Sequence, residues 1–225
     1  MSDAERSLWD DGAYADRQER LNTLLASLET STDALTTASC KLEIAGLQLD
    51  LDNKTAASEY LQGLVALFIE HQQFEQTAMA CQYIYLCDTD NAVCAIGQAA
   101  WLAITYPVDP NLTISILDNI VDETPDESDG AAVAAATAHY VVDLRAPEDQ
   151  KAHLHHVTGS MLARVAKRHS HIEDQQQFDV WARTLELDEP DKFLVRMRNV
   201  IDVMVQQDWW FDRETLQDAL PAGDD

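Results

Sequence analysis

Apolar residues recur along this chain at intervals of three and four positions. The clearest case is the set Leu61, Leu64, Val65 and Phe68. This spacing places all four side chains on one face of an α-helix, whereas a half-buried strand would alternate with a period of two. Similar spacing recurs in residues 13–28 and after Glu189. We therefore expect an all-α protein made of amphipathic helices.

Turn residues divide the chain into helices joined by short loops. With only 7 glycines and 6 prolines in 225 residues, the chain lacks the turn residues of an all-β protein. Asp109 followed by Pro110 is typical of an N-cap and a first helical position. The expected helices cover about residues 13–28, 34–50, 61–68 and 74–87, a segment that includes 96–102, a helix that begins at 110, and residues 131–144, 148–168, 178–185 and 190–207, followed by a short helix that ends at 220.

The most loop-like stretch is residues 124–130, with the sequence TPDESDG. We expect it to separate two helical regions. The predicted organisation is a flexible N-terminus at 1–12, an acidic region of helical hairpins at 13–124, a C-terminal helical bundle at 130–220 and an acidic tail at 221–225.

Acidic residues greatly outnumber basic ones, with 40 Asp and Glu against 15 Lys and Arg and a formal charge of −25. Between Lys54 and Arg145 there is no Lys or Arg at all. Such a surface repels the phosphates of nucleic acids and anionic lipids, so we expect neither as a partner. Three explanations of the acidity remain open: solubility or adaptation to high salt, a basic partner protein, and mimicry of a nucleic acid.

The N-terminus and the cysteines point to a reduced, cytoplasmic protein. The first residues, MSDAERSLWDD, show neither a basic start nor an apolar stretch of a signal peptide. The longest apolar run, 131–138, is too short to span a membrane. The four cysteines have no CxxC spacing, which favours free thiols.

Residues 58–91 resemble one tetratricopeptide repeat, a helical hairpin of 34 residues. Leu61, Leu64 and Val65 match apolar positions of its first helix, and Phe68 matches the aromatic that follows. Phe74 matches the aromatic that opens the second helix.

A second, less complete copy begins at Asn91. Ile96-Gly97 matches the Leu-Gly pair of the repeat, and Tyr106 matches its aromatic. The resemblance covers residues 58–123, and residues 61–106 are similar to small acidic tetratricopeptide chaperones of bacterial secretion systems. It implies an α-solenoid of stacked antiparallel hairpins.

In such a solenoid, the first helices of successive hairpins line a concave groove. The positions expected to face it are Glu59, Gln62, Ile69, Cys94, Gln98 and Trp101. A negative groove of mixed polarity suits a basic or extended segment of another protein. The expected function is therefore that of a non-enzymatic adaptor or chaperone.

A histidine-rich segment supports the main alternative. Five of the seven histidines lie within 153–171. Asp149, His153 and His156 fall at i, i+4 and i+7, so one helix face could hold a divalent metal ion with a fourth ligand from elsewhere. The alternative is thus a helical metal-binding protein or enzyme; otherwise no cofactor is expected. No nucleotide-binding or hydrolase motif supports an enzyme, and a DNA-mimic inhibitor is a third hypothesis.

Trp209, Trp210 and Phe211 form the densest aromatic cluster of the sequence. Two interpretations are open. The cluster packs the last short helix onto the body of the protein, or it forms an exposed patch for a partner or for a homodimer.

Overall fold

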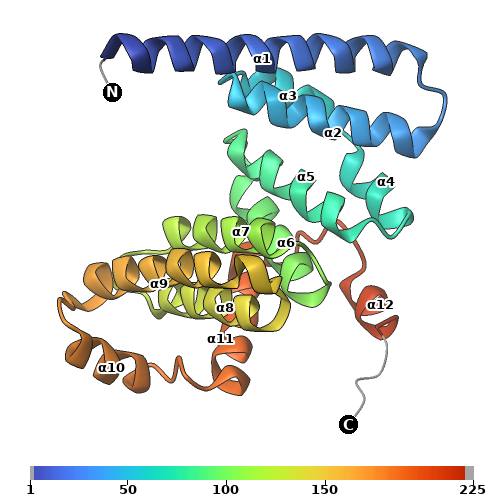
Figure 1. The fold of residues 1–225 in the computed structure, drawn as a ribbon. Helices are drawn as coiled ribbons and strands as arrows, with labels where there is room; N and C mark the ends of the chain where they lie inside the picture. Colours follow the sequence, from blue (N-terminus) through green and yellow to red (C-terminus); the bar gives the residue numbers. More distant parts are fainter. Residues whose placement is uncertain (1–2, 221–225) are drawn as a thin grey trace. The chain divides into compact units, whose positions relative to one another are not determined.

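The computed structural model describes residues 3–220, with side chains from Tyr14 onward. Every regular element in these residues is an α-helix, so the expected all-α class is confirmed (Figure 1). The expected acidic tail at 221–225 lies outside the described residues. Across 3–220, no helix combines the length and the apolar character that crossing a bilayer requires.

The chain divides into two compact units, and the second begins at Val93. The loop 124–128 that we expected to separate two regions lies inside the second unit. It joins two helices that pack against each other, and this packing makes them part of one core.

The first unit is built around one central helix, α2. Its helices are α1 (Asp3–Thr30), α2 (Ala34–Asp50), α3 (Lys54–Leu61), α4 (Leu64–Glu70) and α5 (Phe74–Leu86). α2 packs against each of the other four. Asp33 caps α2 by accepting a hydrogen bond from the Thr36 N–H at 2.7 Å, as its sequence position predicts. The start of α1 at Asp3 lies ahead of the expected start near Ala13, in the segment 1–12 that we predicted to be flexible.

The helix predicted to carry Leu61, Leu64, Val65 and Phe68 is interrupted, and this prediction is wrong. Gly63 adopts φ +75°, in the left-handed region, and separates α3 from α4. Only glycine takes up this conformation without steric cost. The four apolar side chains are nevertheless all buried, because the turn returns α4 to the same core.

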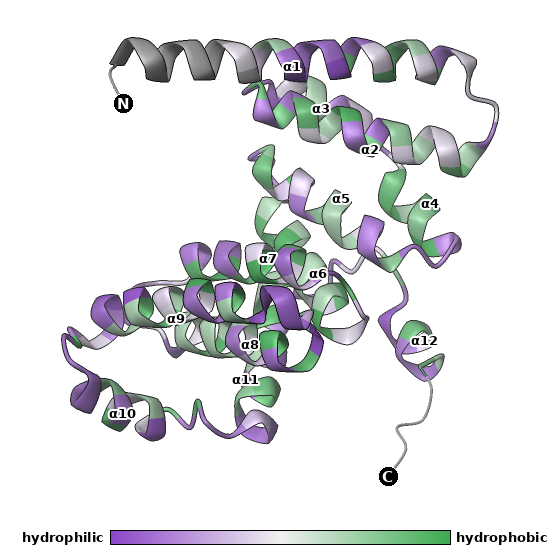
Figure 2. Cartoon of the chain, in the orientation of Figure 1, coloured by the Kyte–Doolittle hydropathy of each residue, from purple (hydrophilic) through white to green (hydrophobic). Residues whose placement is uncertain are grey.

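The second unit is organised around α8, an alanine-rich helix. Its helices are α6 (Ala92–Thr105), α7 (Pro110–Glu123), α8 (Asp129–Arg145), α9 (Glu148–Ser170), α10 (Gln175–Thr184), α11 (Pro190–Val205) and α12 (Arg213–Asp218). α8 packs against α7, α9 and α11, and residues 130–138 are all buried. α9, by contrast, alternates between hydrophilic and hydrophobic residues, as expected of a helix with one exposed face (Figure 2).

Arginine side chains cap the ends of two helices in this unit. Arg145 donates hydrogen bonds of 2.7 and 2.6 Å to the carbonyl oxygens of Ala103 and Ile104, at the end of α6. Arg168 donates one of 2.9 Å to the Val121 carbonyl near the end of α7. The last carbonyls of a helix have no partner within the helix. Neither α6 nor α7 has a basic residue in its last turn, so later parts of the chain supply the caps.

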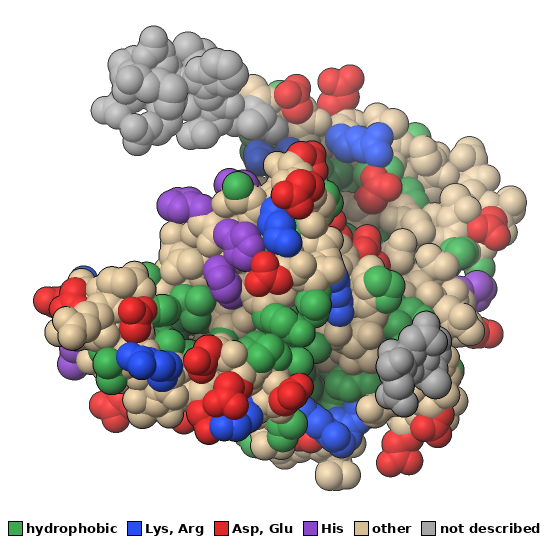
Figure 3. All heavy atoms as spheres, turned by 60° about the horizontal axis from the view of Figure 1, so that its bottom comes forward, with side chains coloured by type: hydrophobic (Ala, Val, Ile, Leu, Met, Phe, Trp, Pro, Cys, Tyr) green, Lys and Arg blue, Asp and Glu red, His purple; other side chains and the backbone are tan. Residues whose placement is uncertain are grey.

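On the surface, basic side chains lie next to acidic ones. Arg20 and Glu43 pair at 2.9 Å in the first unit, and Lys192 and Glu189 pair at 3.0 Å in the second. The face drawn in Figure 3 shows Lys and Arg interspersed with Asp and Glu. Exposed pairs of this kind contribute little to stability, so the core and the helix caps dominate it.

Two glycines on different helices give a matched test of this packing. A Cβ at Gly97 would lie 2.7 Å from Val205 Cγ2 and 3.1 Å from Met204 Cβ, whereas a Cβ at Gly159 would have no atom within 4 Å. Gly97→Ala should lower the free energy of unfolding by about 1–3 kcal/mol through overpacking between α6 and α11. Gly159→Ala should raise it by about 0.5–1 kcal/mol, because alanine is the better helix former. Urea unfolding followed by circular dichroism measures both, and equal effects of the two variants would contradict the close packing at Gly97.

Candidate functional site

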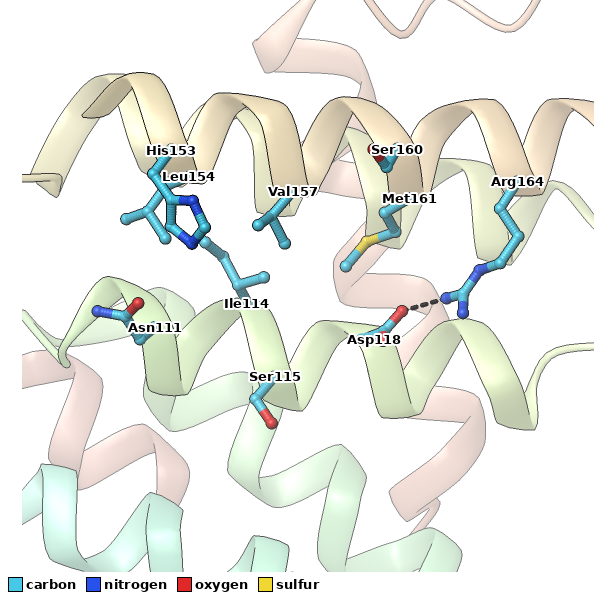
Figure 4. Close-up of a pocket in the computed structure, with 10 residues that line it drawn as sticks. All are labelled: Asn111, Ile114, Ser115, Asp118, His153, Leu154, Val157, Ser160, Met161 and Arg164. Carbon is cyan, nitrogen blue, oxygen red and sulfur yellow. Dashed lines mark hydrogen bonds and ion pairs between the residues drawn. The ribbon is translucent and has the colours of Figure 1, made fainter. Parts of the chain in front are cut away.

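An open groove of about 470 Å³ runs between α7 and α9 (Figure 4). Four apolar side chains from the two helices form its floor: Ile114, Leu154, Val157 and Met161. Its remaining lining residues are polar or charged: Asn111, Ser115, Asp118, His153, Ser160 and Arg164. An apolar surface with a few polar groups around it is the usual composition of a binding site.

One end of the groove carries more negative than positive charge. Arg164 forms an ion pair with Asp118, drawn as a dashed line in Figure 4, and its Nη2 lies 3.8 Å from Oδ1 of Asp122. Two carboxylates therefore share one guanidinium, and a net charge of about −1 remains. All three side chains are substantially exposed, so the pairing is weak enough to be exchanged for another cation.

The other end of the groove is lined by Asn111 and His153. Asn111 Nδ2 donates a hydrogen bond of 3.3 Å to Gln150 Oε1, which links the start of α7 to the start of α9. Glu148 and Asp149 lie in the first turn of α9. Acidic residues there interact favourably with the helix dipole, but neither of them lines the groove.

The expected partner-binding residues fall into two sets, one in each unit. Glu59 and Gln62 are exposed in the first unit, where Gln62 belongs to the turn that ends α3, and Ile69 is half-buried on α4. Cys94, Gln98 and Trp101 lie on α6 in the second unit. The structure thus brings the last three together on one helix.

The α6 set is covered by the protein's own C-terminal segment. Gln98 is 0% exposed, and its Oε1 accepts a hydrogen bond of 2.9 Å from the Trp210 N–H. The Trp101 ring lies 5.6 Å from the Phe211 ring, centroid to centroid. Of the two interpretations of the aromatic cluster, packing onto the body is the one observed. The expectation that Gln98 and Trp101 line an open groove is wrong for this structure, because residues 208–211 cover them.

The predicted metal ligands do not form a site. Asp149, His153 and His156 are all exposed on α9. Among residues 3–220, no group of three or more His, Cys, Asp or Glu side chains is placed to hold a metal ion. The spacing along one helix is right, but Asp118, the carboxylate that α7 contributes to the groove lining, pairs with Arg164. A fourth ligand is therefore missing from this part of the structure.

A different pair of histidines is half-buried between α8 and α9. His139 Nδ1 lies 2.8 Å from Thr158 Oγ1, whose hydroxyl donates to the Leu154 carbonyl at 2.9 Å. The Thr158 oxygen therefore accepts a hydrogen bond from His139, which assigns the proton of the neutral ring to Nδ1. Burial lowers the pKa of His139, and the nearby His155 lowers it further.

His155 has an acidic partner of its own. Its ring lies 4.8 Å from that of His139, and its Nε2 lies 3.2 Å from Oδ1 of Asp143. Lys151 Nζ lies 3.8 Å from the same carboxylate oxygen. The sequence grouped His155 with the other histidines of α9, and nothing in it indicated that His139 would be its neighbour.

Comparisons with known proteins add no assignment to this geometry. No protein-family model matches the chain, and no curated protein or solved structure matches it. The tetratricopeptide resemblance stays a prediction.

His139 predicts a specific dependence of stability on pH. Its pKa is lowered in the folded state, whereas an unfolded histidine has a pKa of about 6.5. The unfolded state therefore binds more protons in mildly acidic solution, and folding stability is lost as the pH falls below about 6.5. In His139→Gln, the free energy of unfolding should fall less between pH 7.5 and 5. Urea unfolding of the wild type and the variant across this pH range measures the difference. Both proteins keep the neighbouring His155, Asp143 and Lys151, so the comparison isolates the change at His139. Parallel pH profiles would show that His139 titrates normally.

Proposed function

We propose that this protein is a non-enzymatic adaptor or chaperone-like protein that binds a basic, extended segment of another protein in the groove between α7 and α9. The observation that carries this proposal is the open apolar floor between α7 and α9, next to two carboxylates, Asp118 and Asp122, that share one guanidinium. An apolar floor favours binding through buried area, and the negative charge selects for a basic partner.

The length of the groove limits what it can hold. Along α9 it extends from His153 to Arg164, and at about 1.5 Å per residue this corresponds to roughly 16 Å. An extended chain covers that length in about five residues. A matching segment would place one or two apolar side chains on Ile114, Val157 and Met161.

The charge arrangement indicates where a cation of the partner would bind. Asp118 and Asp122 share Arg164, so a Lys or Arg of the partner can neutralise the remaining charge. The pairing partners are already half-exposed, so little desolvation opposes this exchange. The basic residue of the partner would therefore lie towards the end of α7.

Val157 offers a direct test because a matched valine lies elsewhere in the same unit. Val157→Lys places a cation on the groove floor, whereas Val195→Lys makes the same change at a valine of α11 that is 60% exposed and does not line the groove. The wild type and Val195→Lys should retain the same proteins from native extract. Val157→Lys should retain at least about tenfold less of them. Their binding should also weaken as salt is added, because charge attraction is screened.

Circular dichroism of the two variants controls for folding. If Val157→Lys retains the same proteins as the wild type, the groove is not the binding site. If binding is unaffected by salt, the partner segment is not selected by its basic charge.

A further inference from the structure

The C-terminal segment packs on Gln98, Trp101 and Tyr106, which we call its seat. This seat has the properties of a binding site. Gln98 is completely buried, and its amide contacts the main chain of the segment at two points. Its Nε2 lies 3.5 Å from the carbonyl oxygen of Asp208, and its Oε1 accepts the 2.9 Å hydrogen bond from the Trp210 N–H. A buried amide that pairs with both a donor and an acceptor of an extended chain recognises main chain rather than a particular side chain.

Side chains add selectivity to this main-chain contact. Trp101 contacts both Trp209 and Phe211, with ring centroids 5.9 and 5.6 Å away. Tyr106 donates a hydrogen bond of 3.0 Å to the Leu216 carbonyl. The seat therefore holds the segment from residue 208 to residue 216.

The connection between α11 and this segment is strained. Gln206 has φ +54° and ψ −118°, the geometry of the first central residue of a type II′ turn. Glycine favours this position, and a residue with a Cβ is held there against a steric cost. Gln206 and Gln207 are exposed and border a hollow of about 480 Å³ next to the connection. The segment is thus held by several contacts where it packs on α6, whereas the turn before it is strained and is closed by one main-chain hydrogen bond, from the Asp208 N–H to the Val205 carbonyl at 3.1 Å.

We propose that segment 207–220 is exchangeable between two copies of the chain, each copy seating its segment on α6 of the other. Such exchange replaces the strained turn at Gln206 by an extended connection and keeps every contact at the seat. Arg213, which pairs with Asp202 at 2.5 Å, keeps an equivalent partner. It does so because α6 and α11 of one chain stay packed together at Gly97. This pairing is independent of the groove between α7 and α9.

Trapping with a disulfide in the full-length chain tests the proposal directly. Cys94 Sγ lies 3.4 Å from the carbonyl oxygen of Asp208, so a thiol introduced by Asp208→Cys comes within reach of Cys94. On mild oxidation at increasing protein concentration, exchange yields a covalent dimer on a non-reducing gel. Adding Cys94→Ser should abolish the dimer, which excludes links through the other cysteines. Links that form only within one chain, up to the highest soluble concentration, would overturn the proposal.

Hinge variants give a second measurement that does not depend on disulfide geometry. Gln206→Gly relieves the strain of the closed form and should lower the dimer association constant at least about tenfold. Deleting Gln207 shortens the turn and should shift the chain towards twice its mass of 25.2 kDa in sedimentation experiments. Gln206→Gly is expected to fold at least as well as the wild type, so its result stands even if the deletion variant does not fold. A dimer fraction unchanged by Gln206→Gly would show that any pairing uses another surface.

Discussion

The second unit depends on the close burial of α8. Residues 130–138 of this helix are buried without a break, and most of them are alanine. Small side chains on every face let α7, α9 and α11 all approach the same helix. The groove between α7 and α9 is a consequence of this arrangement, because both helices pack on α8 and leave an open strip between their outward faces. A larger residue in the middle of α8 would therefore disturb the groove as well as the core.

The uneven charge of the chain becomes a structural constraint in this unit. Residues 55–144 contain no Lys or Arg, so the helices within this stretch cannot supply basic residues for their own C-terminal ends. Arg145 lies just beyond the stretch and Arg168 lies near the end of α9; they reach back to the carbonyls of α6 and α7. The protein thus uses two of its scarce cations on main-chain oxygens, and Arg168 also pairs with the Asp126 carboxylate at 3.2 Å. The two arginines reach these carbonyls because α8, which ends at Arg145, and α9, which carries Arg168, pack in the same unit as α6 and α7.

Local signals in the sequence predicted most of the helices and their ends. The caps at Asp33 and Asp109 and the helical continuation through residues 139–142 all follow from residue types and spacing. The break at Gly63 did not, because apolar spacing is unchanged by a turn that preserves the buried face. The α7–α9 groove, the pairing of His139 with His155 and the covering of Gln98 were also not predictable. Each depends on which residues of distant helices face one another, and a single sequence does not contain that register.

The charged side chains of the protein make two kinds of contact, exposed ion pairs and half-buried hydrogen bonds to main-chain carbonyls, and dissolved salt affects them differently. Exposed pairs such as that of Arg20 with Glu43 act through solvent, and the screening length falls to about 3 Å at 1 M salt. The contacts of Arg145 with the carbonyls of Ala103 and Ile104 are half-buried hydrogen bonds at contact distance, which mobile ions reach poorly. In concentrated salt the attraction within the exposed ion pairs would weaken, while the arginine hydrogen bonds at the ends of α6 and α7 would persist. Repulsion among the many carboxylates would weaken as well. High salt should therefore lower the stability of the fold less than the loss of its ion pairs alone would.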